Sequence, residues 1–168
     1  MNEQELILEF KKAMENPIYL NGHDNVLRIA DGKVVAKVYL KEYEGFAQRY
    51  FRIANELYLL HPVPKMHSLL DLEEHGVDFK IYSPFAKKFY SARFSLFMDF
   101  FDGKYIFEVS NKLLRENICE RVNKAYESIK SLGYFLLDTH DKNMLYNERT
   151  DRFCLLDFDG WNLPSRKS

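Results

Sequence analysis

The residues best suited to chemistry are Asp138, Asn143 and Asp157. Asp138 comes five positions before Asn143, and the apolar run 153–156 ends directly at Asp157. Carboxylate and amide oxygens in this layout can hold a phosphate-bound Mg²⁺, while another carboxylate accepts the proton of an attacking hydroxyl. The spacing therefore indicates transfer of a phosphoryl group to a hydroxyl acceptor.

A structural role for the same residues is the alternative, because Asp and Asn also favour turns and caps, where they bond to the backbone. The apolar strand that runs into Asp157 favours the functional interpretation. Two neighbours are less specific. Asp159 could be a secondary neighbour of a metal, and His140 could contact phosphate or metal, or make a hydrogen bond within its own loop.

The elements that must position these residues can be predicted from periodicity and turn residues. Asp31-Gly32 separates two β-branched runs and predicts a hairpin of 26–29 with 34–39, which carries Lys37 in its second strand. A helix over 41–60 follows and carries Glu56. Its expected apolar stripe consists of Phe46, Tyr50, Ile53, Leu57 and Leu60.

Further elements follow the same reasoning. Helical spacing predicts helices over 3–15 and 110–132, the second ending at Ser131-Leu132-Gly133. Strands are expected at 77–84 and 94–101, joined by a basic and aromatic linker. A hairpin of 144–146 with 153–156 would carry Asn143 before its first strand and Asp157 after its second. The tail 164–168 is expected to be disordered.

Composition bounds the partners and the compartment. With 24 basic against 25 acidic residues, a net charge of -1 gives no global reason to expect nucleic acid or a membrane surface. Cys119 and Cys154 are too few and too far apart for a disulfide framework or zinc site, which favours a reducing, cytoplasmic location. No apolar run is long enough for a membrane span, and the N-terminus lacks the basic start of a signal peptide.

The order of elements resembles the protein-kinase-like fold over nearly the whole chain. Val34-Val35-Ala36-Lys37 resembles the lysine motif of that family's third strand, and 96–103 resembles the strand and hinge that link its lobes. The resemblance implies a minimal α+β kinase-like fold. Residues 1–103 would form an N-lobe and hinge, with a small antiparallel sheet and one helix, that binds nucleotide. Residues 104–168 would form a truncated helical C-lobe with the catalytic and metal-binding loops.

The resemblance also implies a role for each matching residue, with ATP and Mg²⁺ as cofactors. Lys37 would hold the phosphates and Glu56, nineteen positions later, would orient it. Asp138 would be the catalytic base, and Asn143 with Asp157 would bind the metal. At the hinge, Met98 would back the adenine pocket, while the backbone of Asp99 and Phe101 would bind the adenine edge.

The Asp-x-His-x-x-Asn pattern at 138–143, followed by Asp-Phe-Asp at 157–159, is similar to atypical kinases of aminoglycosides and lipopolysaccharide sugars. Short protein kinases secreted by bacteria also look similar, and their location would be the host cytoplasm. The chain departs from the family in lacking Gly-x-Gly-x-x-Gly, so the phosphate cover at 20–26 is abbreviated. Leu136 stands where many kinases have His, and few residues follow Asp157 to carry an acceptor platform.

These observations predict a minimal protein Ser/Thr kinase. The alternatives are a kinase of a sugar, lipopolysaccharide or other small-molecule hydroxyl, and a pseudokinase that acts as a protein-binding module. A protein substrate or an activating protein partner is expected, with self-association as another way to cover the apolar residues expected to be exposed on the 110–132 helix.

Overall fold

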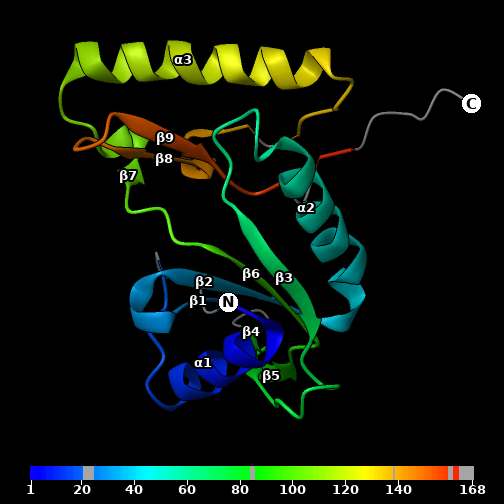
Figure 1. Ribbon diagram of the computed structural model, residues 1–168. Coiled ribbons are helices and arrows are strands. Elements are labelled where there is room, and N and C mark those ends of the chain that lie inside the picture. Colours follow the sequence, from blue (N-terminus) through cyan, green and yellow to red (C-terminus); the bar gives the residue numbers. More distant parts are fainter. Residues whose placement is uncertain (21–24, 84–85, 138, 159–160, 163–168) are drawn as a thin grey trace, which may run out of the picture. The chain divides into compact units, whose positions relative to one another are not determined.

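The computed structural model describes residues 1–20, 25–83, 86–137, 139–158 and 161–162, so the tail predicted at 164–168 lies outside it. Its helices and antiparallel strands are shown in Figure 1. The chain forms two compact units. Unit 1 comprises Met1–Phe51 with Met66–Phe100, and unit 2 comprises Arg52–Lys65 with Phe101–Ser168. Helix α2 (Glu44–Leu57) contributes to both. The functional division into 1–103 and 104–168 remains a prediction.

Unit 1 is built on a four-stranded antiparallel sheet with the strand order β1-β2-β6-β3. The strands are β1 (Val26–Ile29), β2 (Val34–Tyr39), β3 (Met66–Asp71) and β6 (Phe94–Asp99). The predicted hairpin is confirmed. Its turn runs through Ala30, Asp31 and Gly32, which all have left-handed φ angles. Gly32 has a φ of 82°, a backbone conformation that residues with a side chain rarely adopt, so glycine is favoured at this point of the turn.

Helix α1 (Glu3–Glu15) covers one face of this sheet, as its predicted amphipathic spacing requires. A capping box starts the helix, because the Asn2 side chain accepts from the Glu5 amide and the Glu5 carboxylate accepts from the Asn2 amide. Its buried side chains pack on alternate residues of the strands. This core includes Leu6, Ile7, Phe10, Leu27, Ile29, Val34, Ala36, Val38 and Phe97.

Three strands were not predicted. In β3 the buried positions include Ser68, and the register with β6 shifts between Met66 and Ser68, so no apolar alternation is legible. The predicted strand 77–84 is confirmed only as β4 (Lys80–Ser83), which pairs with β5 (Lys88–Ser91) in a separate two-stranded ribbon. The expected basic linker therefore contains β5. The third, β7 (Lys104–Tyr105), spans two residues, too short for a periodic signal.

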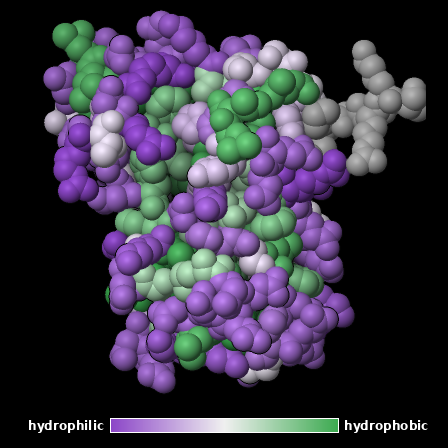
Figure 2. All heavy atoms as spheres, viewed as in Figure 1, coloured by the Kyte–Doolittle hydropathy of each residue, from purple (hydrophilic) through white to green (hydrophobic). Residues whose placement is uncertain are grey.

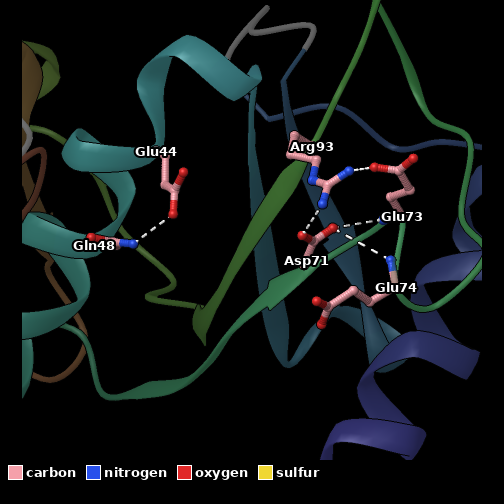
Figure 3. A network of polar contacts seen from close by, with 6 residues as sticks. All are labelled: Glu44, Gln48, Asp71, Glu73, Glu74 and Arg93. Atoms are coloured by element: carbon pink, nitrogen blue, oxygen red, sulfur yellow. Dashed lines mark hydrogen bonds and ion pairs between the residues drawn. The ribbon is translucent and has the colours of Figure 1, made fainter.

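Arg93, expected in that linker, fastens a corner of the sheet just before β6 (Figure 3). Its guanidinium contacts the Asp71 carboxylate at 2.6 Å and also the Glu73 carboxylate. Its backbone N–H donates to the Tyr39 carbonyl, and its carbonyl accepts from the Leu72 amide, both at 2.8 Å. Arg93 therefore joins the ends of β2 and β3 to the start of β6, and its charge is balanced locally.

Unit 2 holds a three-stranded antiparallel sheet and the longest helix. The sheet has the order β7-β8-β9, with β8 at Met144–Asn147 and β9 at Arg152–Leu155, which confirms the second predicted hairpin. Helix α3 (Lys112–Ser131) runs along this sheet (Figure 1). Gly133, with a φ of 93°, follows its last turn and donates to the Lys130 carbonyl, which confirms the predicted stop.

The apolar stripes of the two long helices differ from expectation at their ends. On α2, Tyr50, Ile53 and Leu57 are buried, but Phe46 is exposed and Leu60 lies beyond the last helical turn with 71% of its surface exposed. On α3 the outward face is polar, as the hydrophilic surface of Figure 2 also shows. Over the predicted span 110–132, the exposed large apolar residues are Leu113 near the start of α3 and Leu132 at its C-cap.

Two further expectations concern cysteines and membranes. Cys119 and Cys154 are both free thiols, and burial raises the pKa of the Cys154 thiol to about 12, so it stays protonated and inert. Among the described residues, no helix combines the length and apolar character that crossing a bilayer needs.

Phe10→Ala should test the core of unit 1. Phe10 is fully buried against Phe79 and Phe97, so its truncation should lower the free energy of unfolding by about 3–5 kcal/mol. Leu8→Ala on the exposed face of the same helix should cost no more than about 0.5 kcal/mol. Urea denaturation followed by circular dichroism measures both. Equal losses would show that α1 does not pack as described.

Candidate active site

Lys37 lies on the face of the unit 1 sheet opposite α1. Because successive strand residues point to opposite faces, the core positions Val34, Ala36 and Val38 leave Val35 and Lys37 on the other side. Lys37 pairs with Val26 of β1 and Leu96 of β6, and its side chain is half-buried. The lysine predicted to hold phosphates is therefore central in its sheet.

Aromatic rings stabilise the Lys37 ammonium in this position. Its Nζ lies 5.4 Å from the ring centroid of Tyr39 and 5.2 Å from that of Tyr50 on α2. At such distances a cation is attracted to the negative face of each ring, which offsets part of its desolvation. The Lys37 ammonium thus lies near two aromatic rings on a largely apolar surface.

The predicted adenine-pocket residue Met98 shares this face. It pairs with Val35 across β2 and β6, and both are buried. The Tyr50 hydroxyl lies 4.0 Å from the Met98 sulfur. The Lys37 face of unit 1, formed by Val26, Arg28, Val35, Lys37, Leu96 and Met98, thus combines an apolar floor with two cations, Lys37 and Arg28.

The predicted hinge leaves the end of β6. The Asp99 carboxylate lies 2.7 Å from Nε2 of His67, and the Phe100 amide donates to the Lys33 carbonyl at 2.9 Å. Phe101 is the first residue of the second segment of unit 2, and a Cβ at Gly103 would lie 2.7 Å from its ring. The chain thus passes between the units at the segment predicted as the hinge. Adenine binding by the backbone of Asp99 and Phe101 remains a prediction.

The segment 20–26, predicted to form an abbreviated phosphate cover, is flanked by paired backbone. The Leu20 amide donates to the Val26 carbonyl and the Arg28 amide to the Ile18 carbonyl, both at 2.9 Å, with a bridge between Tyr19 and Leu27. Residues 18–20 therefore add a short pairing segment to the outer edge of β1. The connecting residues 21–24 lie outside the described chain, although Asn21-Gly22 is a hairpin signal in the sequence.

Unit 2 brings the two predicted metal ligands together. The last register pair of β8 and β9 is Met144 with Leu155, and beyond it the Leu156 amide donates to the Asn143 carbonyl at 2.8 Å. Asn143 therefore lies opposite Leu156, one residue before Asp157. Asn143 is buried and Asp157 is half-buried. The hairpin thus places an amide and a carboxylate at the same end of the sheet.

Asp157 has a left-handed backbone with a φ of 61°. This conformation costs a residue with a Cβ roughly 1–2 kcal/mol, and non-glycine residues held there cluster at functional sites. The segment around Asp157 must therefore be fixed by other contacts.

Aromatic packing supplies those contacts. Phe158 and Trp161 are fully buried against each other with ring centroids 4.6 Å apart, and Trp161 also meets Tyr126 of α3. Nε1 of Trp161 donates to the Leu137 carbonyl at 2.9 Å. Two backbone hydrogen bonds join Phe135 to Asn162. The chain before position 138 is therefore fastened to the chain after Asp157.

Asp138, the predicted catalytic base, lies outside the described residues, as does Asp159. The following loop is described. His140 caps the short 3-10 helix Asp141–Asn143, because its Nδ1 accepts from the Lys142 amide at 3.2 Å and its carbonyl accepts from the Asn143 amide at 2.9 Å. This supports the structural role that the sequence left open for His140, and a phosphate contact remains a prediction.

Glu56, the predicted partner of Lys37, belongs to the part of α2 in unit 2, whereas Lys37 belongs to unit 1. Its described contacts are with Arg52, whose Nε lies 2.9 Å from Oε1, and with the Tyr134 hydroxyl, which donates to Oε2. Burial and the bond to Glu56 raise the pKa of Tyr134 above its usual range. Sequence reasoning missed Tyr134, and no local signal marks it. The ion pair of Glu56 with Lys37 remains a prediction.

The donor set fits Mg²⁺ as a partial site. Mg²⁺ takes oxygen ligands and usually keeps one or two protein ligands, with water and phosphate oxygens completing its shell. Asn143 and Asp157 supply one amide and one carboxylate. Over the described residues, no cluster of three His, Cys, Asp or Glu side chains could hold a metal alone. The arrangement therefore suits a cation that arrives with phosphate.

Comparisons with known proteins bear on the fold. No protein-family model matches the sequence, and no curated protein matches it. Among solved structures, the Rio2 kinase-ADP/Mg²⁺-phosphoaspartate complex from Chaetomium thermophilum is similar, with a TM-score of 0.57 and 15% identity. The match covers 95% of this chain and 53% of that chain, so the present chain spans about half the length of the kinase. The expected fold class is confirmed, and the chain has a small α+β protein-kinase-like fold.

Proposed function

We propose that the protein is an ATP- and Mg²⁺-dependent phosphotransferase with a hydroxyl acceptor. The observation that carries the proposal is the backbone bond from the Leu156 amide to the Asn143 carbonyl, which holds Asn143 opposite the residue that precedes Asp157. A turn residue needs no such partner from another strand. Two oxygen ligands held at one end of a hairpin suit a phosphate-bound Mg²⁺.

The Lys37 face supports nucleotide binding. Ligand sites are mostly apolar with a few placed polar groups, and this face offers Val35 and Met98 to a base and one ammonium to phosphates. The fold is that of a Rio2 kinase solved with ADP and Mg²⁺. Glu56 would orient the Lys37 ammonium, as the resemblance implies.

In the proposed reaction the acceptor oxygen attacks the γ-phosphorus, and the bond from that phosphorus to the β,γ-bridging oxygen breaks as ADP leaves. Asp138 takes the proton of the acceptor hydroxyl. Lys37 holds the phosphates, while Asn143 and Asp157 hold the cation. When bound, Mg²⁺ neutralises the charge on the phosphate oxygens.

For the acceptor we propose a protein Ser or Thr. Beside the predicted hinge, the ring of Phe107 is exposed and stacks on Tyr105 with centroids 5.3 Å apart. An open aromatic surface suits an extended peptide, whereas a sugar requires a concave site with polar groups for its ring hydroxyls. Radiolabelled ATP with a protein mixture, aminoglycosides and lipopolysaccharide sugars separates these acceptors. Label in a sugar alone would replace the protein acceptor with the small-molecule one.

Nucleotide binding should depend on Lys37. ATP-Mg²⁺ at about 100 times its dissociation constant should raise the unfolding midpoint by about 5–10 °C, because it binds only the native state. Lys37→Met should remove most of this shift, and Lys41→Met, at an exposed lysine of the same unit, should keep it. Differential scanning calorimetry measures each midpoint. No shift in the wild type, with no heat of nucleotide binding, would leave the protein-binding pseudokinase as the better proposal.

Asp157 should separate backbone strain from metal binding. The free energy of unfolding should be about 1 kcal/mol higher for Asp157→Gly than for Asp157→Ala, because glycine adopts the left-handed conformation without steric strain from a Cβ. Both variants should lose the Mg²⁺-dependent part of nucleotide binding. Urea denaturation and titration calorimetry with and without EDTA provide the measurements. Retained Mg²⁺ dependence in the glycine variant would exclude Asp157 as a metal ligand.

Asp138→Asn should lower turnover by about 10²–10⁴-fold with little change in ATP affinity, because it keeps the size of the side chain but removes the base. Single-turnover assays with labelled ATP and equilibrium binding test the two parts. Asp141→Asn is the matched control, since Asp141 is the next carboxylate along the loop. If Asp141→Asn proves the more damaging change, the base is Asp141.

A further inference from the structure

The carboxylate of Glu56 is held by two donors within unit 2. Nε of Arg52 contacts Oε1 from one turn earlier on α2, and the Tyr134 hydroxyl contacts Oε2 from 78 positions later in the chain. The Arg52 side chain is 48% exposed, whereas Tyr134 is only 7% exposed. Exposed ion pairs are screened by water and contribute little, so of these two contacts the one from Tyr134 should contribute more to holding the carboxylate.

Tyr134 is suited to a fixed donor role. Burial and the neighbouring carboxylate raise its pKa, so the phenol remains protonated and continues to donate at physiological pH. Its backbone is also restrained from both sides. Gly133 ends α3 just before it, and Phe135 just after it forms two backbone hydrogen bonds with Asn162.

The same segment carries the elements of the candidate site. Two residues beyond Phe135, the Leu137 carbonyl accepts from Trp161, which packs on Phe158, the residue after Asp157. One hydrogen bond from Tyr134 therefore connects α2 to the segment that leads to position 138. This segment is itself hydrogen-bonded to residues that follow Asp157. The bond from Tyr134 is a partly buried side-chain link between these parts.

We infer that Tyr134 is a positioning residue: its hydroxyl fixes the Glu56 carboxylate in the orientation that Lys37 needs, and couples this orientation to the catalytic segment. The inference rests on the proposed function, in which Glu56 orients Lys37. A carboxylate can accept about four hydrogen bonds, so its contacts with Arg52 and Tyr134 do not by themselves exclude an ammonium. Tyr134 acts through Glu56 and need not touch the nucleotide.

Tyr134→Phe tests this by removing one oxygen atom. It should lower kcat/KM for ATP by about 10-fold, because a hydrogen bond to a charged group contributes about that factor. Tyr146→Phe is the matched control: Tyr146 is also buried in unit 2, and its hydroxyl donates to the Asp151 carboxylate at 2.8 Å, away from Glu56. It should change kcat/KM less than about 2-fold, although both variants lose a similar bond.

A double-mutant cycle with Glu56→Ala tests whether the effect of Tyr134→Phe on kcat/KM depends on Glu56. A purely structural role of Tyr134 would not show this dependence. Once Glu56 is absent, Tyr134→Phe should cost less than about 2-fold in kcat/KM. Arg52→Gln should cost no more than about 5-fold, because its pair is exposed. Thermal unfolding of every variant accompanies the kinetics, and the ATP-induced shift of the midpoint gives a second measure of nucleotide binding.

The outcomes distinguish this inference from the proposed function. If the wild type neither binds ATP-Mg²⁺ nor transfers phosphate, both are overturned. If the wild type is active but Tyr134→Phe matches Tyr146→Phe, only the inference is overturned. The same holds if the effect of Tyr134→Phe persists in full without Glu56, or if Arg52→Gln is the more damaging change.

Discussion

The candidate site depends on one backbone hydrogen bond, from the Leu156 amide to the Asn143 carbonyl at 2.8 Å. It extends the pairing of β8 and β9 beyond Met144 and Leu155, and it holds Asn143 opposite Leu156, the residue before Asp157. Without it, the Asn143 side-chain amide and the Asp157 carboxylate would lie on two independent loops, and ordering these loops would reduce the binding free energy of a ligand. Because the hairpin orders both segments when the protein folds, ligand binding does not bear this entropic cost.

The polar residues of unit 2 are held by apolar ones. Asp157 adopts a left-handed backbone that persists only where surrounding contacts over-determine it, and Phe158, Trp161 and Tyr126 supply such contacts. Burial of each ring removes about 150–250 Å² of aromatic surface from water. The resulting hydrophobic stabilisation is larger than the strain energy of one left-handed residue. Rigid packing beneath a polar loop is the arrangement that positioning of reacting groups requires.

In unit 1 one face of the sheet packs against α1, and the opposite face carries Lys37. Alternate residues of β2 either pack under α1 or lie on the Lys37 face, so the same strand supplies stability and chemistry. A shift of one residue in the register would bury Lys37 in the apolar core and expose Ala36 or Val38 in its place. The turn at Gly32 and the corner at Arg93 therefore matter to the site, because they help fix the register of β2.

The sequence by itself determined most helices, both hairpins and the residue types of the site, because periodicity, caps and turn chemistry act over a few residues. Lys37 lies on the strand predicted for it, and Asn143 and Asp157 flank the predicted hairpin of β8 and β9. Strand β3 was missed because a buried Ser68 and a register shift hide its alternation. The partners of Glu56 could not be predicted. Tyr134 reaches it from 78 positions away, and only tertiary packing decides which of many distant donors a carboxylate meets.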